Sequence, residues 1–485
     1  MNIVLVATYE MGRQPFGLAS PAAWLRQLGA LVHCVDLSRE QFPVATIRDA
    51  DLVAFYVPMH TATRLAVQLI GPLQHLNPRA HICFYGLYAS MNEQYLRSLG
   101  VQTILGGEFE EGLAHLAARL RPKGLTANEG LQASGGRLST ADVQSRIKEV
   151  PSSIPSESSQ QEPVLSLARL RFQIPDRSGL VPLDRYAHLV MNAGDHRAVG
   201  YTEASRGCRH LCRHCPIVPV YNGMFRIVDR QVVLEDVRRQ IAAGARHITF
   251  GDPDFFNGVG HALAIVQELH REHPRITYDV TIKIEHLRKH RQHLETLRDT
   301  GCLFVTSAVE SVDDAVLERL DKGHTRADVL ATVRDFRELG MILQPTLVPF
   351  TPWTTLESFA ELLRILREEE LQEHVAPIQL AIRLLIPASS RLLELPEVSE
   401  LVGPFDPERL AHPWHHPDSR VDALCEEVQD IVAAGEKMKR SRSAAFEAIH
   451  RAASRALGIS EEAWRTAEPR IARAAIPYLD EPWYC

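Results

Sequence analysis

Short apolar runs alternate with helical patterns through the first 120 residues of the chain. The segments between the runs carry apolar side chains three or four positions apart, which marks one face of a helix. Such alternation is typical of parallel strands joined by crossover helices. It predicts an α/β domain over residues 1–120, built on a doubly wound, five-stranded parallel sheet that would bind ligands beyond the carboxyl ends of its strands. The expected strands are residues 3–7, 31–36, 51–57, 80–86 and 103–107.

A second series of strand and helix patterns occupies residues 199–395. Its six strand candidates are too many for a repeat of the first domain. They predict a partial (β/α)6 barrel of the TIM type, a fold that places its chemistry at the carboxyl ends of the strands. The expected strands are residues 200–205, 247–252, 277–284, 302–308, 343–350 and 378–387.

The remaining segments differ in composition from these two domains. Residues 121–163 contain too few large apolar side chains to offset the entropy of ordering, so we expect a disordered linker. Residues 164–198 connect this linker to the barrel. Residues 396–485 begin Pro-rich and then carry helical patterns, which predicts a mostly helical C-terminal extension.

Charge and composition narrow the class of protein. The chain has 485 residues, with 53 Lys and Arg against 60 Asp and Glu, and a formal net charge of −7. A negative net charge is unfavourable for a protein that mainly binds the phosphate backbone of nucleic acid. No apolar run approaches the roughly 18 residues needed to span a bilayer, and no basic segment precedes the apolar N-terminus. We therefore expect a soluble protein of the reducing cytoplasm, with neither a membrane nor a nucleic-acid partner.

Three of the eight cysteines form a cluster, Cys208, Cys212 and Cys215, directly after the first expected barrel strand. Their C-x3-C-x2-C spacing lets three thiolates hold three corners of a cubane iron–sulfur cluster and leaves the fourth iron open. Zinc is the alternative metal for soft ligands, with His210 or His214 as a fourth ligand. A disulfide is disfavoured in a reducing compartment. The position at the end of a barrel strand favours catalysis.

This loop resembles that of the radical S-adenosylmethionine (radical SAM) superfamily. The resemblance implies that the three cysteines ligate a [4Fe-4S] cluster and that S-adenosyl-L-methionine binds the open iron, where reduction of the cluster cleaves it to methionine and a carbon-centred radical. The family usually has an aromatic residue near adenine before the third cysteine, and here that position is His214.

Other candidates for cofactor binding are matched to the family by their places at strand ends. Residues 248–255 occupy the place of the Gly-Gly-Glu motif that binds the SAM amino group. Ordinary loop or N-cap carboxylates are the alternative for the two aspartates, and a salt bridge at the barrel rim is the alternative for Arg383. The candidates are Gly251, Asp252, Asp254, Lys283, Glu285, Ser307, Glu310 and Arg383.

The order of a doubly wound domain before this barrel resembles the cobalamin-binding class of the superfamily. The Asp-x-His-x-x-Gly motif that supplies a cobalt ligand is absent, because the first loop reads TYEMGRQPFG and contains no histidine. Neither G-x-G-x-x-G nor a P-loop follows the first strand, which disfavours nucleotide binding. For the N-terminal domain, two roles therefore remain: it binds cobalamin, or it only caps the substrate cavity.

Longer phrases, among them FGDPDFFNG, KIEHL and LDKGHT, resemble the radical SAM group with a CUAEP or CCAEP tail. The chain ends EPWYC, so we expect Cys485 to be the first residue of a Cys-Sec pair and a catalytic candidate. An incidental cysteine on a frayed terminus is the alternative. A soft nucleophilic pair would suit a thiophilic species. The other four cysteines, Cys34, Cys83, Cys302 and Cys425, are expected to be packed hydrophobes.

The sequence therefore predicts a radical SAM enzyme, of transferase or related type, that modifies a small molecule or transfers a SAM-derived group to it. The resemblance also implies an electron donor such as flavodoxin or ferredoxin. Transfer to a thiophilic acceptor such as trivalent arsenic is one alternative, and a zinc-binding sensor or scaffold without turnover is another. The substrate and the transferred fragment are not encoded in any motif.

Overall fold

The computed structural model describes residues 1–121, 161–191, 195–459 and 476–480. The expected linker at 121–163 and Cys485 therefore fall largely or wholly outside the described residues. The chain divides into two compact units. The first comprises residues 1–9 and 15–180, and the second comprises residues 10–14 and 181–485.

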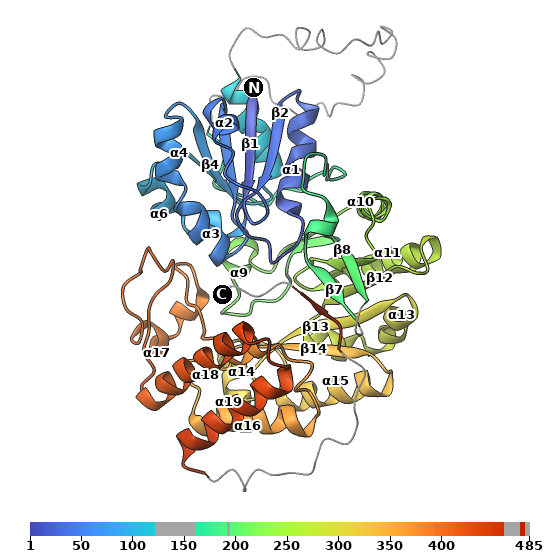
Figure 1. Ribbon diagram of the computed structural model, residues 1–485, viewed down its shortest axis with the longest axis vertical. Helices are drawn as coiled ribbons and strands as arrows, with labels where there is room; N and C mark the ends of the chain where they lie inside the picture. Colours follow the sequence, from blue (N-terminus) through green and yellow to red (C-terminus); the bar gives the residue numbers. More distant parts are fainter. Residues whose placement is uncertain (122–160, 192–194, 460–475, 481–485) are drawn as a thin grey trace. The chain divides into compact units, whose positions relative to one another are not determined.

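The first unit contains a parallel sheet in the order β2-β1-β3-β4-β5-β6 (Figure 1). This order reverses direction between β1 and β3, which is the switch point of a flavodoxin-like doubly wound sheet. All five expected strands are confirmed. The two-residue β6 joins the edge from the connecting segment. The strands are β1 Asn2–Ala7, β2 Leu31–Asp36, β3 Leu52–Tyr56, β4 His81–Tyr85, β5 Thr103–Gly107 and β6 Leu165–Ser166.

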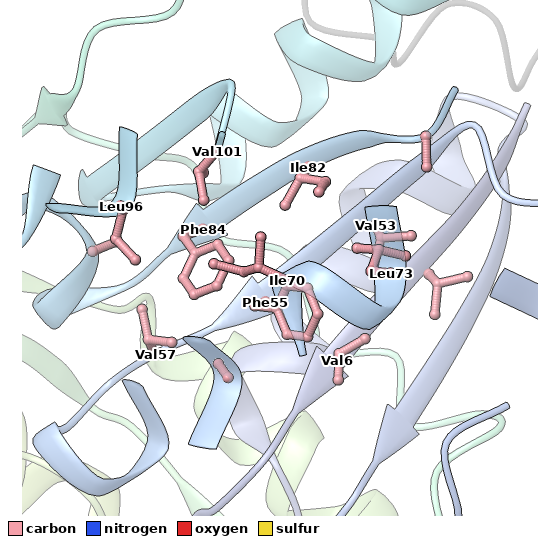
Figure 2. Close-up of a cluster of buried hydrophobic side chains, with 14 of the residues drawn as sticks. Val6, Val53, Phe55, Val57, Ile70, Leu73, Ile82, Phe84, Leu96 and Val101 are labelled. Carbon is pink, nitrogen blue, oxygen red and sulfur yellow. The ribbon is translucent and has the colours of Figure 1, made fainter. Parts of the chain in front are cut away.

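Both faces of this sheet are buried. Successive side chains of a strand point to opposite faces, and in this sheet both sets of side chains lie in apolar clusters. On β3, Val53 and Phe55 join one apolar cluster with Phe84 (Figure 2). Leu52 and Ala54 join a second cluster on the other face. The helices of this unit are α1 Phe16–Gln27, α2 Val44–Arg48, α3 His60–Val67, α4 Ile70–Leu76, α5 Leu87–Met91, α6 Glu93–Ser98 and α7 Glu110–Leu120.

The second unit is built on a curled sheet in the order β14-β13-β12-β11-β8-β7-β15. The five strands from β14 to β8 are parallel and form a half-barrel, and β7 and β15 add antiparallel to its edge. The strands are β7 His188–Val190, β8 His196–Thr202, β11 His247–Phe250, β12 Thr277–Thr281, β13 Cys302–Glu310, β14 Ile342–Leu347 and β15 Tyr478–Leu479. A short hairpin, β9 Ser205–Gly207 with β10 Phe225–Ile227, follows β8.

The sixth expected strand, residues 378–387, is wrong as a strand. The segment begins with a 3-10 helix at Pro377–Leu380, and it pairs with the sheet through a single parallel bridge between Phe350 and Arg383. Pro377 explains the difference, since proline favours the first turn of a helix and donates no ladder hydrogen bond. The partial barrel therefore has five parallel strands in place of the six expected.

Helices cover the half-barrel and form most of the C-terminal extension. α15 and α16 each begin at a capping box, Thr325 with Asp328 and Thr355 with Ser358. α19 contacts both α16 and α18 (Figure 1). Among the described residues, no helix is both long and apolar enough to cross a membrane. The helices are α9 Val218–Tyr221, α10 Arg230–Ala242, α11 Val259–Glu272, α12 Ile284–Lys289, α13 Leu294–Asp299, α14 Asp314–Arg319, α15 Arg326–Glu338, α16 Leu356–Glu368, α17 Pro396–Ser399, α18 Ser419–Lys437 and α19 Arg442–Leu457.

Candidate functional site

The loop that carries Cys208, Cys212 and Cys215, here called the cysteine loop, begins after Gly207, the last residue of β9. This glycine has a φ of 75°, and a Cβ there would lie 2.5 Å from both the Met224 carbonyl oxygen and the Tyr221 ring. No other residue fits without moving the backbone. The Asn257 side chain holds the next turn, because its Oδ1 accepts from the Arg209 amide at 3.1 Å and its Nδ2 donates to the Gly207 carbonyl at 3.4 Å.

The three cysteines of this loop share a buried environment. All three are free thiols, with Cys212 buried and Cys208 and Cys215 partly so. Burial, together with a smaller effect from the charge of neighbouring cysteines of the loop, raises the pKa of Cys208 to about 11 and that of Cys215 to about 12. Several thiolates on one short, buried loop are stable together only beside a multivalent cation. This donor set fits an iron–sulfur cluster or another soft metal centre.

A buried ion pair lies at the end of β13, beside the cysteine loop. Glu310 has a φ of 65°, where the register of β13 shifts against β14. Its Oε1 accepts hydrogen bonds from His214 Nε2 at 3.1 Å and from Lys322 Nζ at 3.4 Å. Burial alone would raise the pKa of Glu310, but the Lys322 charge and the His214 hydrogen bond lower it to about 2. The strained, ionised glutamate is thus fixed between His214 and a buried lysine.

Residues at the ends of β11 and β12 form a second polar group. Lys283 Nζ lies 3.0 Å from Glu285 Oε2 and 3.1 Å from His210 Nδ1. Asp254 Oδ2 lies 3.3 Å from His210 Nε2 and 2.8 Å from His286 Nδ1. The structure therefore brings the sequence candidates Asp254, Lys283 and Glu285 together, with His210 from the cysteine loop.

Asp252 and Gly251 hold the turn that follows β8. Asp252 accepts hydrogen bonds from the Ala204 amide at 2.9 Å and from Ser205 Oγ at 2.5 Å. Burial raises the pKa of Asp252 to about 7. A Cβ on Gly251 would lie 1.8 Å from the Tyr201 hydroxyl oxygen, which requires glycine there. These contacts are structural, and cofactor binding by either residue stays a prediction.

Ser307 and Arg383 lie in different surroundings. The Ser307 hydroxyl is fully buried and has no hydrogen-bond partner among the described residues. The Arg383 guanidinium donates to Asp422 at 2.7 Å and to the Trp414 carbonyl at 2.8 Å, and it stacks on the Trp414 ring at 3.6 Å. Arg383 thus forms the rim ion pair that the sequence offered as its alternative role.

Sequence reasoning missed two buried residues of these groups, Lys322 and His286. Lys322 follows α14 in a polar turn, LDKGHT, that reads as exposed. His286 stands next to Glu285, so the strand-end rule that found Glu285 could have found it. The four cysteines expected to be packed hydrophobes, at 34, 83, 302 and 425, are all buried, which confirms that prediction.

Residues 202–363 match the radical SAM superfamily. Over 206 residues, 40% of this chain and 44% of the relative, the sequence is 25% identical to a tRNA-2-methylthio-N(6)-dimethylallyladenosine synthase of Desulfosudis oleivorans. A hopanoid C-3 methylase of Methylococcus capsulatus is 23% identical over 151 residues, 31% of this chain and 29% of that protein. The chain thus spans less than half the length of these curated relatives.

Two solved structures share the fold over most of the chain. The cobalamin-dependent S-adenosylmethionine radical enzyme OxsB, with aqua-cobalamin and S-adenosylmethionine bound, has a TM-score of 0.66 and 15% identity, and covers 89% of this chain and 66% of its own. The radical S-adenosylmethionine methyltransferase TsrM from Kitasatospora setae, with cobalamin and a [4Fe-4S] cluster bound, has a TM-score of 0.53 and 16% identity, and covers 76% of this chain and 70% of its own. Membership of the CUAEP-tail group stays a prediction. The cysteine loop therefore lies within a radical SAM domain, which the family match places at residues 202–363.

Proposed function

We propose that the chain is a radical SAM enzyme in which Cys208, Cys212 and Cys215 hold a [4Fe-4S] cluster and S-adenosyl-L-methionine binds beside it. The observation that carries the proposal is the C-x3-C-x2-C spacing of three free cysteines inside the region that matches the radical SAM superfamily. When bound, the reduced cluster supplies the electron that cleaves the sulfonium. The protein positions the reactants and excludes water.

The residues around the loop have separable roles in this proposal. Asn257 and Gly207 fix the backbone from which the first cysteine projects. Lys322 acts to lower the pKa of Cys215, against the larger raising effect of burial, and it neutralises Glu310. Lys283 and Glu285 remain candidates for polar contacts with SAM, since they stand at the carboxyl end of β12.

The first unit is proposed to bind cobalamin. Its doubly wound sheet and switch point are of the kind that holds a cofactor beyond the strand ends, and both fold relatives named above contain cobalamin. The loop after β1 offers no histidine to cobalt. A small-molecule acceptor is favoured by the net charge of −7, which opposes tight binding of an RNA backbone.

Anaerobic turnover tests this function. The reconstituted full chain is incubated with SAM and dithionite, with and without cobalamin, and the products are separated. We expect SAM consumption in both cases, and S-adenosylhomocysteine in the presence of cobalamin if a methyl group is transferred. Release of 5′-deoxyadenosine alone would indicate radical chemistry without cobalamin. No SAM consumption by a protein with a full cluster would contradict the enzyme assignment.

The loop backbone gives a further prediction. Gly207→Ala places a methyl group against the Met224 carbonyl, so the loop must shift and its iron content after reconstitution should fall although every cysteine remains. Gly244→Ala is the matched control, because Gly244 also has a positive φ, 104°, but a Cβ there meets no atom within 4 Å. Equal iron contents in the two variants would show that the loop geometry is not needed. Iron and sulfide analysis decides between these results.

A further inference from the structure

Three potential metal ligands outside the cysteine set converge in the second unit. They are His210, Asp254 and His286, and one ligand atom from each lies within 4.8 Å of the other two. The two imidazole rings are 4.5 Å apart between centroids. Asp254 Oδ2 lies against both rings, 2.8 Å from His286 Nδ1 and 3.3 Å from His210 Nε2.

Neighbouring parts of the fold bring these three side chains together. β11 and β12 are parallel neighbours, so their carboxyl ends meet at the same edge of the sheet. Asp254 follows β11 and His286 lies on α12 just after β12, while His210 comes from the cysteine loop. The Asp254 carboxylate is already oriented, since its Oδ1 accepts from the Phe256 amide at 3.0 Å. Its Oδ2 is therefore left for the two imidazoles.

The three converging atoms lack satisfactory partners. None of His210 Nε2, Asp254 Oδ2 and His286 Nδ1 makes a hydrogen bond of acceptable geometry, although the atoms are close. The side chains are only 11%, 1% and 8% exposed, respectively. Buried polar atoms are nearly always satisfied, because leaving one unpaired is costly. A cation at their centre would satisfy all three atoms at once.

We propose that His210 Nε2, Asp254 Oδ2 and His286 Nδ1 bind one divalent first-row transition metal ion. Two imidazoles and one carboxylate are a common ligand set for Zn²⁺ and for non-haem Fe²⁺. With metal–ligand bonds of about 2.0–2.2 Å, ligand atoms lie roughly 3–3.5 Å apart. The Asp254 oxygen lies 2.8 Å and 3.3 Å from the two nitrogens, and all three atoms lie within 4.8 Å of one another. Three protein ligands leave a coordination position open to water or to a substrate.

The surroundings of His210 support its role as a ligand. Glu285 Oε2 lies 3.4 Å from His210 Nδ1, on the side of the ring away from Asp254. In the tautomer with its proton on Nδ1, His210 donates to this carboxylate and leaves Nε2 free for a metal, whereas a hydrogen bond from Lys283 to Nδ1 needs the other tautomer. Lys283 Nζ also lies 3.1 Å from His210 Nδ1, and it pairs with Glu285 at 3.0 Å. The two carboxylates thus offset two of the three positive charges that the lysine and a divalent metal bring.

This site is chemically separate from the cysteines. Its nitrogen and oxygen donors favour harder ions than three thiolates do. It would tie the cysteine loop to the ends of β11 and β12, and it can be loaded without a [4Fe-4S] cluster. The proposal therefore goes beyond the SAM chemistry proposed above, and it can fail or succeed independently.

A titration with Co²⁺ tests the proposal. The full chain carrying Cys208→Ala, Cys212→Ala and Cys215→Ala removes every thiolate of the loop. We expect it to bind one equivalent of Co²⁺ with visible ligand-field bands but without sulfur-to-cobalt charge transfer, and Zn²⁺ should displace the cobalt. His286→Ala or Asp254→Asn in this background should weaken binding by more than about 100-fold, and Glu285→Gln by about 10–100-fold.

Two controls keep the test decisive. His290→Gln changes a ring 5.7 Å from that of His286 but outside the cluster, so Co²⁺ binding should not change. If the cysteine-free chain does not fold, metal analysis of the cluster-loaded wild-type chain should find one equivalent of zinc that His286→Ala and Asp254→Asn lose. Absence of binding, or binding that both substitutions leave unchanged, overturns the proposal, and Asp254 then accepts hydrogen bonds from two imidazoles instead.

Discussion

Cys212→Ala is expected to abolish the iron–sulfur centre. Reconstituted wild-type chain should contain about four irons and four sulfides, and the variant less than about a tenth of that, because a cubane loses its attachment when one of three thiolates is removed. SAM cleavage should fall to background with it. The measurement is iron, sulfide and product analysis under anaerobic conditions.

The matched control for this experiment is Cys425→Ala. Cys425 is buried like Cys212, but it lies on α18 and is predicted to be a packed hydrophobe. Its substitution should leave the iron content unchanged and cost at most about 1–2 kcal/mol of unfolding free energy, as for the loss of a small buried group. Full iron content in Cys212→Ala, or its loss in Cys425→Ala, would refute the assignment of the cluster ligands.

Lys322→Met is expected to destabilise the second unit strongly. Lys322 is 2% exposed and pairs with the buried Glu310 carboxylate at 3.4 Å. Removing one partner leaves an uncompensated buried charge, which typically costs about 3–5 kcal/mol. The double variant Lys322→Met with Glu310→Gln removes both charges and should recover part of the loss. Thermal unfolding of the full chain measures both variants.

The stability of the wild type and that of Lys322→Met should change in opposite directions as the pH falls. In the wild type the pKa of Glu310 is about 2, below its usual 4.5, so its stabilising contribution is present above pH 4.5 and is lost as the pH falls toward 2. Without Lys322, burial acts to raise this pKa, so the variant should gain stability on acidification from neutral pH. A loss of stability in the Lys322→Met variant between pH 7 and 5 would contradict the role given to the lysine.

The sequence predicted most of the fold, because strand periodicity and burial coincide where a sheet is covered on both faces. Val53 and Phe55 belong to one side and Leu52 and Ala54 to the other, so β3 appears as a continuous apolar run. The segment at 378–387 is equally apolar, yet it is mostly not a strand. Its apolar pattern shows that the segment is buried. Its backbone conformation depends instead on Pro377 and on packing against the C-terminal extension.

The candidate site was predicted less completely. A motif gives the spacing of residues along the sequence, whereas a site depends on which side chains lie close together in the fold. The cysteines were found by their spacing in one short loop. The pairing of Glu310 with Lys322 and of Asp254 with His286 joins residues from separate elements, each unremarkable in its local sequence. Strand-end positions identified one member of each pair. The pairing of β11 with β12 brings His286 to Asp254, whereas Lys322 reaches Glu310 through the turn that follows α14.

Electron paramagnetic resonance of the reduced, reconstituted full chain tests the central claim most directly. If three cysteines hold a [4Fe-4S] cluster with an open iron, the reduced protein should show the signal of a one-electron-reduced cubane, and addition of SAM should change that signal as it binds the iron. A colourless protein that contains zinc in place of iron and sulfide would contradict the claim. So would a cluster signal that SAM leaves unchanged.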